Sequence, residues 1–265
     1  MDITQALVLA IVQGLTEFLP ISSSGHLILV PVLFGWEDQG LAFDVAVHVG
    51  TLLAVMTYFR REIILISKDT FGSVFSGIRT EYSRLGWQVI FTTIPVGLAG
   101  LFLGDWIESS MRDPEWVALA MLLFAPLLWW VDKYNQQKRD IKTLNWRDIL
   151  FIGCAQAIAL FPGVSRSGMT IIAALMLGLN RDAAARFSFL LAIPVIVLAG
   201  GFKTLELIQS DLSIDWGLIL LGVAVSAVVA FACIHWFLGF VQRFSMLPFA
   251  LYLLALGLFI LFVIP

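Results

Sequence analysis

Long apolar runs separated by short polar segments make up most of this chain. Six runs are predicted to cross a bilayer as α-helices, because about 20 helical residues span a hydrocarbon core of about 30 Å. These predicted spans cover residues 41–59, 87–104, 116–131, 183–201, 217–240 and 247–264. We therefore expect an all-α integral membrane protein, and since no linker divides the chain, we expect a single polytopic domain over residues 1–265.

Four further apolar runs are too short to span, and they come in two pairs. They cover residues 3–18, 24–36, 149–161 and 168–179. Pro20 and a run of serines separate the first pair, and Pro162 with Gly163 separates the second. Two half-length helices joined by a polar break are typical of a re-entrant hairpin. The sequence thus predicts two re-entrant helical hairpins, at about 3–36 and 149–179.

The two hairpins are related by an internal repeat with a shift of 143 residues. It aligns Gln13 with Gln156, Ser22 with Ser165, Ser23 with Arg166, Ser24 with Ser167 and Gly25 with Gly168. Inverted repeats whose broken helices meet near the middle of the bilayer are a transporter-like plan, in which the breaks mark the binding site. We therefore predict an inverted repeat with halves at about 1–131 and 144–265.

Two polar loops carry most of the basic residues. Each holds five of the 16 Lys and Arg residues: Arg60, Arg61, Lys68, Arg79 and Arg84 in residues 60–86, and Lys133, Lys138, Arg139, Lys142 and Arg147 in residues 132–148. Cytoplasmic loops of membrane proteins are enriched in Lys and Arg. With six spans, this rule predicts periplasmic termini, a first hairpin that enters from the periplasmic face and a second that enters from the cytoplasm. Their polar tips would meet near mid-membrane.

The composition argues against a soluble protein and against a nucleic-acid-binding protein. Hydrophobic residues make up 60% of the chain and charged residues only 13%, whereas soluble domains average about 25% charged residues. The net charge of −3 argues against a nucleic-acid partner. Cys154 and Cys233 both lie in apolar runs, so we expect buried thiols and no disulfide framework.

The first break concentrates polar groups that are costly at membrane depth. Gln13 and Glu17 are one helical turn apart and share a helix face. They are either a polar pair at a helix end or part of a catalytic site. The serines Ser22–Ser24 precede a helix, where one of them would act as the N-cap and the free amides would attract an anion. His26, one turn after Ser23, is either catalytic or structural.

The second break contains Arg166, whose planar guanidinium suits a phosphate group. Neighbouring residues would add hydroxyl donors or allow close backbone approach: Gly163, Ser165, Ser167, Gly168 and Thr170. The alternative is an intramembrane ion pair between Arg166 and Glu17, which would hold without substrate even if Arg166 binds phosphate during turnover. His48 either borders this site or is a polar core residue, and His235 is expected to be packed or interfacial.

These residues carry a family resemblance. The pair Gln13 and Glu17, the run Ser22–His26 and the run Pro162–Thr170 resemble the signature motifs of the undecaprenyl-diphosphate phosphatase (bacitracin-resistance protein) family, in register over essentially the whole chain. The resemblance implies a bacterial inner-membrane hydrolase whose site opens to the periplasm. It would convert undecaprenyl diphosphate to undecaprenyl phosphate and phosphate, recycling the lipid carrier for peptidoglycan synthesis. Bacitracin acts on this same substrate.

Carried over by position, the resemblance assigns Glu17, His26 and Arg166 to a catalytic core and places Ser23, Ser165, Ser167 and Thr170 around the diphosphate. We expect Ser23 to be catalytic as well. Further substrate-binding residues are expected from the two breaks: Gln13, Ser22, Ser24, Gly25, Gly163 and Gly168. The family's first motif position is Glu or Gln, and Gln13 weakens any scheme in which paired carboxylates hold a metal. The resemblance implies dependence on Mg²⁺ or Ca²⁺, and a cation bridging Glu17 and the diphosphate is expected without a dedicated metal site.

Two mechanisms fit these assignments. In one, His26 activates Ser23 for attack on the terminal phosphorus while Glu17 orients the imidazole. In the other, His26 or Glu17 activates a water molecule. A lipid transporter or flippase is an alternative function that the inverted repeat invites, and an intramembrane serine protease is disfavoured because it has no use for Arg166. The sequence leaves the oligomeric state open, a homodimer included.

Overall fold

The computed structural model describes residues 1–111, 113–208 and 215–263, and it is built almost entirely from helices. In chain order these are α1 (Ile3–Thr16), α2 (Ser23–Phe34), α3 (Leu41–Tyr58), α4 (Arg60–Ser76), α5 (Glu81–Ser110), α6 (Pro114–Tyr134), the short 3-10 helix η1 (Ile141–Thr143), α7 (Trp146–Ile158), α8 (Arg166–Met176), α9 (Arg181–Ile208), α10 (Trp216–Val241) and α11 (Leu247–Val263). No strand occurs in these residues beyond an isolated bridge between Arg139 and Leu179. The all-α fold class is confirmed.

Five helices are long and apolar enough to cross a membrane: α3, α5 over Glu81–Gly104, α6, α9 over Arg181–Leu205, and α10. Their outward faces carry large exposed apolar side chains, such as Phe102 at 76% and Leu123 at 70% exposure. Such surfaces are stable in lipid and not in water. The chain is therefore an all-α membrane protein.

Two predicted elements differ from the structure. The span predicted at 247–264 corresponds to α11, whose 17 described residues make it one of the shorter apolar helices. The span predicted from residue 87 belongs to α5, which begins at Glu81 because Thr80 and Ser83 form a capping box, each side chain bonding the other's backbone N–H. Local capping chemistry thus extends the helix beyond its apolar run.

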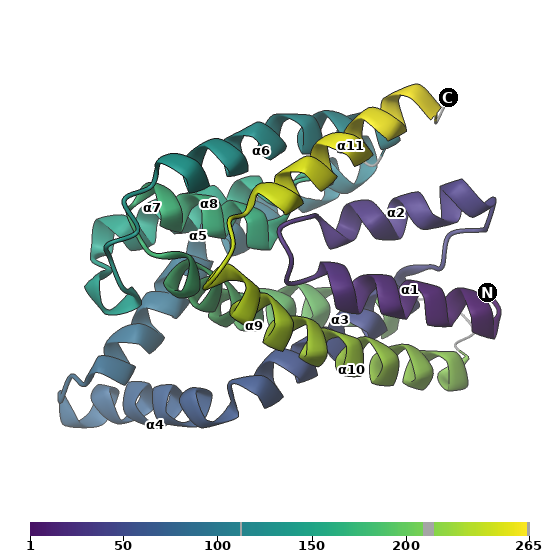
Figure 1. The fold of residues 1–265 in the computed structure, drawn as a ribbon. Helices are drawn as coiled ribbons and strands as arrows, with labels where there is room; N and C mark the ends of the chain where they lie inside the picture. The colour runs from purple at the N-terminus through teal and green to yellow at the C-terminus, as the bar shows by residue number, and fades with distance from the viewer. Residues whose placement is uncertain (112, 209–214, 264–265) are drawn as a thin grey trace.

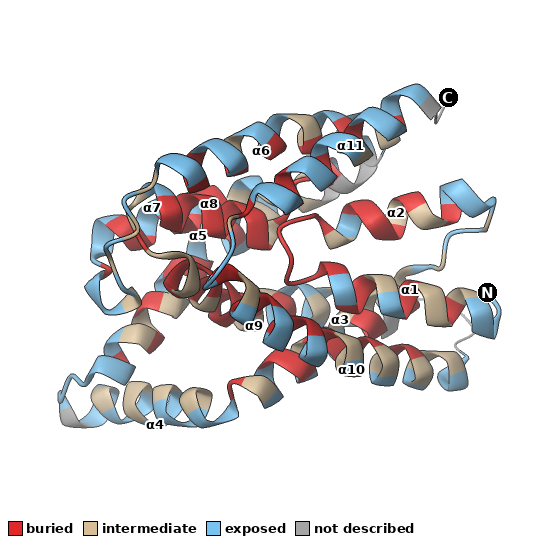
Figure 2. Cartoon of the chain, in the orientation of Figure 1, coloured by how far each residue is buried: buried red, intermediate tan, exposed pale blue. Residues whose placement is uncertain are grey.

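The two short helical pairs predicted from the polar breaks are present as α1–α2 and α7–α8. Each pair forms a hairpin, and the loops of both hairpins lie in the interior of the molecule, while both termini lie at one end (Figure 1). The longer helices surround them, with α3 and α1 packed on α10, and α5 packed on α7 and α9. Buried residues gather along α8, along the first half of α9 and in the first hairpin's loop (Figure 2).

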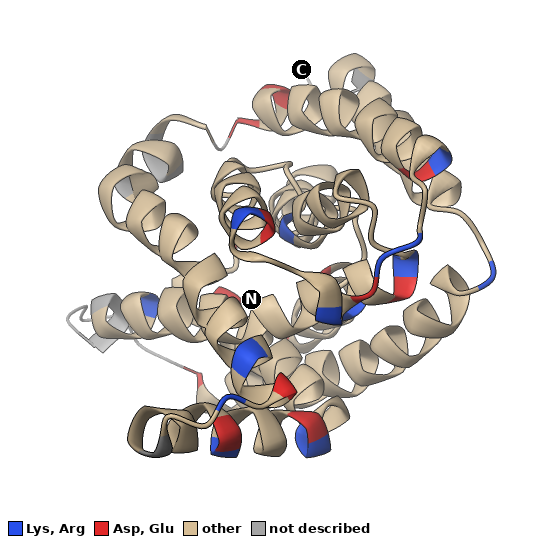
Figure 3. Cartoon of the chain, turned by 90° about the vertical axis from the view of Figure 1, so that its left-hand side faces the viewer, with Lys and Arg blue, Asp and Glu red and all other residues tan. Residues whose placement is uncertain are grey.

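The two basic loops lie at the same end of the molecule, as their shared charge predicts. The Lys142 ammonium lies 2.8 Å from the Glu81 carboxylate, and Arg84 donates to the Leu144 carbonyl at 2.5 Å. Figure 3 looks onto this end, where blue and red residues lie at the ends of otherwise uncharged helices. Because charges are tolerated mainly outside the hydrocarbon layer, this end belongs at a membrane surface.

The cysteine prediction holds only in part. Cys233 is buried and its thiol donates to the Leu15 carbonyl, whereas Cys154 is exposed. Cys154 lies on α7, at a position facing away from the helices that α7 contacts. A residue in an apolar run is expected to be shielded from water. Either lipid or the protein core can provide that shielding.

Candidate active site

The first hairpin's loop is shaped by an unusual backbone conformation at Ser22. Its φ of +67° lies in the left-handed region, which costs energy for a residue other than glycine. Ser22 is the N-cap of α2, and its hydroxyl accepts from the Gly25 N–H. Of the three serines, Ser22 thus performs the capping role, which leaves Ser23 and Ser24 available for other contacts.

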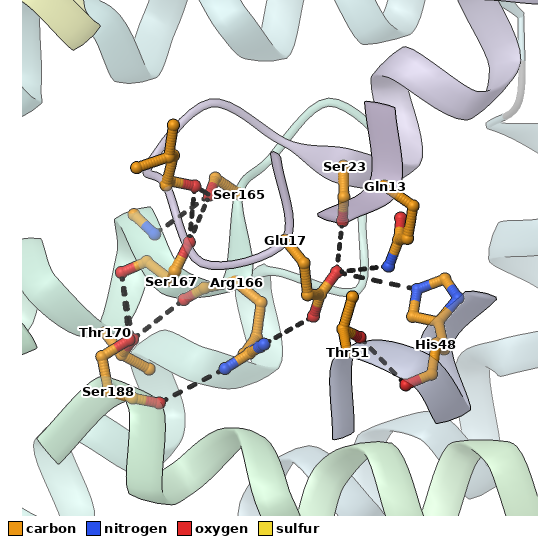
Figure 4. A network of polar contacts seen from close by, with 12 residues as sticks. Gln13, Glu17, Ser23, His48, Thr51, Ser165, Arg166, Ser167, Thr170 and Ser188 are labelled. Carbon is orange, nitrogen blue, oxygen red and sulfur yellow. Dashed lines mark hydrogen bonds and ion pairs between the residues drawn. The ribbon is translucent and has the colours of Figure 1, made fainter. Parts of the chain in front are cut away.

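Glu17 and Arg166 meet where the two hairpin loops come together. Arg166 Nη2 donates to Glu17 Oε1 at 2.6 Å, and both side chains are largely buried, at 13% and 6% exposure. The α1–α2 hairpin supplies the carboxylate and the first residue of α8 supplies the guanidinium (Figure 4). The ion pair predicted as an alternative to a phosphate-binding role is therefore present in the protein without substrate.

The other carboxylate oxygen of Glu17 collects three further side chains. Ser23 Oγ donates to Oε2 at 2.6 Å, and Gln13 Nε2 donates to the same atom at 3.0 Å. His48 Nε2 lies 3.7 Å from it (Figure 4). The helical spacing of Gln13 and Glu17 thus produces the contact that it predicts. A short hydrogen bond from a hydroxyl to a carboxylate prepares that hydroxyl to lose its proton.

Arg166 is held from behind by α9. Its Nη1 donates to the Ser188 carbonyl at 3.3 Å, and the Thr170 and Ser188 hydroxyls lie within hydrogen-bonding distance at 2.7 Å. The Thr170 hydroxyl donates to the carbonyl of Arg166 itself at 3.0 Å. A guanidinium fixed at two of its nitrogens keeps one orientation, so its remaining N–H groups point in a defined direction.

The two hairpin loops are joined through the Leu19 carbonyl. Ser167 Oγ donates to it at 2.8 Å and Ser165 Oγ at 3.4 Å, and the two hydroxyls lie 3.0 Å apart. Ser165 is also the N-cap of α8 and accepts from the Gly168 N–H. Ser165 and Ser167 therefore connect the loop of the α7–α8 hairpin to that of the α1–α2 hairpin. This connection fixes the separation of the elements that carry Glu17 and Arg166.

The predicted relay from Glu17 through His26 to Ser23 is not formed. His26 Nδ1 lies 2.7 Å from the Ser22 carbonyl, and its Nε2 lies 2.6 Å from the Tyr252 hydroxyl on α11. Both ring nitrogens are thus engaged, and the ring stacks on Tyr252. The physical reason is the direction of α2: His26 follows Ser23 by almost one turn, yet its side chain faces α11 while Ser23 faces α1. The imidazole beside Glu17 belongs to His48.

A cavity of about 420 Å³ opens beside these residues. Six of the predicted site residues line it: Glu17, Ser22, Ser23, Ser24, Ser165 and Arg166. The remaining predicted ones are absent from its lining: Gln13, Gly25, His26, Gly163, Ser167, Gly168 and Thr170. Apolar side chains of α2, α5 and α9 complete the wall. The cavity therefore joins a polar, charged corner to an apolar surface.

Gly163 and Gly168, predicted to allow close backbone approach, and Gly25, predicted to bind substrate, all lie where the protein itself packs closely. A Cβ on Gly163, which has a φ of +89°, would lie 2.5 Å from the Val117 carbonyl oxygen of α6. A Cβ on Gly25 would meet Met121, and one on Gly168 would meet Ser165. Glycine is required there for contact between helices and loops.

The site offers little to a metal ion. Among the residues that the structure describes, no group of three or more His, Cys, Asp and Glu side chains is arranged to hold one. Both oxygens of Glu17 already accept hydrogen bonds, from Arg166 on one side and from Ser23 and Gln13 on the other. Mg²⁺ and Ca²⁺ prefer several oxygen ligands, so these residues alone do not fit a resident ion.

Three residues of this site carried too little signal in the sequence to be assigned to it. His48 lies in the middle of an apolar run, Ser188 lies in another, and Gln156 was notable only as the repeat partner of Gln13. Gln156 lines the cavity and is fully buried. A polar residue within an apolar run was the available signal, but it does not tell which residues face a shared cavity.

Comparison with known proteins agrees with this geometry. The family model described as "Bacitracin resistance protein BacA" matches residues 6–259. The chain is 56% identical over 260 residues to undecaprenyl-diphosphatase 2 of Stutzerimonas stutzeri, covering 97% of this chain and 96% of that protein. It is 56% identical over 257 residues to undecaprenyl-diphosphatase of Nitrosococcus oceani, covering 97% of each chain. These matches confirm the resemblance seen in the motifs, and this chain belongs to the bacitracin resistance protein BacA family.

Proposed function

We propose that this protein hydrolyses undecaprenyl diphosphate to undecaprenyl phosphate and inorganic phosphate. The observation that supports it most strongly is the meeting of Arg166, Glu17 and Ser23 at one wall of the cavity, in a chain whose relatives are named undecaprenyl-diphosphatases. Release of the monophosphate carrier would sustain cell-wall synthesis. It would also confer bacitracin resistance, since bacitracin acts on the diphosphate substrate.

The cavity suits both parts of such a substrate. Arg166 and the hydroxyls of the two loops would bind the diphosphate, because a guanidinium and neutral donors neutralise phosphoryl charge. The apolar wall, which includes Leu27, Val96 and Ile196, would accept the first isoprene units. The rest of the prenyl chain would remain in lipid, so that little apolar surface enters water.

We propose Ser23 as the nucleophile and Glu17 as the base that accepts its proton. The Ser23 oxygen attacks the terminal phosphorus, the anhydride P–O bond breaks, and undecaprenyl phosphate leaves. Water then hydrolyses the phosphoserine, releasing phosphate and returning the hydroxyl. The short Ser23–Glu17 hydrogen bond supports a direct transfer. In the competing scheme, Glu17 activates a water molecule while Ser23 binds substrate.

The two histidines take different roles in this proposal. His26 is a positioning residue that holds the Ser22 carbonyl, and through it the loop that presents Ser23. His48 lies across from Glu17 and donates its Nδ1–H to the Asp44 carbonyl at 2.7 Å, because a carbonyl can only accept. Its Nε2 is thereby directed at the Glu17 carboxylate, 3.7 Å away.

We further propose a topology of six spans and two re-entrant hairpins, with α11 as the sixth span. The halves would form an inverted repeat: under the shift of 143 residues, α1 falls on α7, α2 on α8 and α3 on α9. Matching contacts support it, since α10 packs on α1 and α3 as α5 packs on α7 and α9. Applying the positive-inside rule to the basic end puts both termini and the cavity mouth on the periplasmic side of the inner membrane.

A divalent cation would enter this site together with the diphosphate. The phosphoryl oxygens would supply most of its ligands, and Glu17 is the protein carboxylate that would help to hold it. When bound, Mg²⁺ or Ca²⁺ would neutralise phosphoryl charge. The residues described above position the substrate and move its protons independently of that ion.

The deciding experiment measures phosphate release by the purified protein from a long-chain prenyl diphosphate in detergent. Wild-type protein should release phosphate, and Glu17→Gln should lose nearly all activity, because the base and the Arg166 partner disappear together. Lipid movement across liposomes without any phosphate release would instead identify a transporter. Hydrolysis that survives Glu17→Gln would overturn the proposed site.

A further inference from the structure

Gln156 is a buried amide without a protein partner beside the catalytic cavity. It lies on α7, its exposure is 0%, and it lines the cavity. Neither its Nε2 nor its Oε1 has a hydrogen-bond partner among the residues that the structure describes. Leaving a buried amide unpaired is unfavourable, so such a group calls for a ligand or another explanation.

The internal repeat shows why the Gln156 amide has no hydrogen-bond partner in the protein. Its counterpart Gln13 donates Nε2 to Glu17, four residues ahead on the same helix face. The residue four ahead of Gln156 is Leu160, which accepts no hydrogen bond. The second half of the repeat therefore retains the amide and replaces the carboxylate, which leaves the amide unpaired in the wall of the cavity.

The charged residues of the cavity suggest what the Gln156 amide binds. Its charged lining residues are two acids and two bases: Glu17, Asp44, Arg166 and Lys203. These charges sum to zero, so a diphosphate with several negative charges is not neutralised by side-chain charge alone. Alongside a divalent cation, a neutral side-chain amide can donate a hydrogen bond to a phosphoryl oxygen without adding charge to the site.

We propose that Gln156 Nε2 donates a hydrogen bond to a non-bridging phosphoryl oxygen of the bound lipid diphosphate. Gln156 is thus a substrate-binding residue from the second half of the repeat, facing the same ligand as the loop serines and Arg166. This inference rests on the proposed function, because it requires that the cavity is the active site.

The test compares two buried glutamines that differ in their partners. Gln156→Met keeps side-chain length and removes the amide, and it should lower kcat/KM about tenfold, as expected for a lost hydrogen bond to a charged group. Its thermal midpoint in detergent should be unchanged or higher, because an unpaired buried amide is removed. Gln156→Glu should have a lower kcat/KM than Gln156→Met, since a carboxylate repels the diphosphate.

The matched control is Gln88→Met on α5. Gln88 is buried outside the cavity lining, and its Nε2 donates to the Leu144 carbonyl at 2.9 Å. This variant should lower the thermal midpoint and leave kcat/KM unchanged. The inference is overturned if Gln156→Met behaves like Gln88→Met, or if Gln156→Met keeps wild-type kcat/KM.

Two further measurements separate this inference from the proposed function. Inorganic pyrophosphate should inhibit wild-type protein, and its inhibition constant should rise about tenfold in Gln156→Met, as expected for one lost hydrogen bond to a charged ligand. An unchanged constant would overturn the Gln156 contact alone. If Glu17→Gln and Arg166→Lys both retain activity, the cavity is not the active site and the proposed function's site fails instead.

Discussion

Arg166 Nη2 lies 2.6 Å from Glu17 Oε1, although the two residues are 149 positions apart in the chain. The contact joins the loops of two separate hairpins and is almost completely buried. A buried ion pair contributes little net stability, because desolvation offsets much of the attraction, but losing one partner is costly. Its retention at this position therefore favours a role in binding charge over a role in stability.

Breaking this pair on one side should affect stability as well as activity. We expect Arg166→Ala to lower the free energy of unfolding by about 3–5 kcal/mol, since Glu17 is left as a buried charge without its partner. The double variant Glu17→Gln and Arg166→Met should recover most of that loss and remain inactive. Thermal unfolding in detergent and phosphate release measure the two effects. A double variant as unstable as Arg166→Ala would show that the pair is not the cause.

Ser23 should be the only serine of the first loop whose hydroxyl is needed for chemistry. Ser23→Ala is expected to lower kcat by about 10³-fold or more, as for the loss of an activated nucleophile. Ser24→Ala should keep kcat within about tenfold of wild type, because Ser24 lines the cavity and its hydroxyl makes a long contact of 3.4 Å with the Ser22 hydroxyl. Rapid acid quenching followed by mass spectrometry should find phosphate on Ser23. Near-normal turnover by Ser23→Ala would exclude the covalent scheme.

Because His26 contacts Tyr252, a substitution on α11 is expected to lower catalytic activity. Tyr252→Phe removes the hydroxyl bonded to His26 Nε2 and should lower kcat about fivefold, equivalent to about 1 kcal/mol, because the imidazole loses one of its two anchors. His26→Ala should cost more, since the Ser22 carbonyl also loses its partner. Steady-state kinetics measure both variants. Full activity in His26→Ala would rule out a positioning role for this ring.

His48 should act through the ring nitrogen Nε2, which lies across from Glu17. We expect His48→Leu to lower kcat about fivefold, because a contact at 3.7 Å between a partly exposed imidazole and a buried carboxylate is worth about 1 kcal/mol. His48→Gln should restore most of the activity, since its amide N–H can reach the same carboxylate oxygen. Equal losses in both variants would show that the imidazole itself is required.

Removal of divalent cations should lower hydrolysis of the bound substrate. It should not change the substrate-free protein. Chelation is expected to lower phosphate release, and added Mg²⁺ or Ca²⁺ should restore it, because the ion would be held mainly by the diphosphate. Titration calorimetry on substrate-free protein should detect no stoichiometric Ca²⁺ binding. Tight binding of one ion per chain without substrate would contradict this view and indicate a resident site.

The sequence by itself determined the membrane class, the helical fold and the two polar breaks. Apolar periodicity and the high cost of polar groups in lipid are local properties that a sequence displays directly. For the same reason Glu17 and Arg166 could be proposed as site residues before their positions were known, whereas Ser23 was distinguished from Ser22 and Ser24 only with the family resemblance. A carboxylate and a guanidinium have few other uses at that depth.

Only the tertiary structure decided which of these groups share a cavity. A difference of three residues turns His26 toward α11 and Ser23 toward Glu17, while His48 reaches the carboxylate from a separate helix. Gln156 became a candidate only when its amide was found buried, unpaired and beside the cavity. Helix rotation and contacts between distant segments set these relations, and neither property is encoded in local spacing.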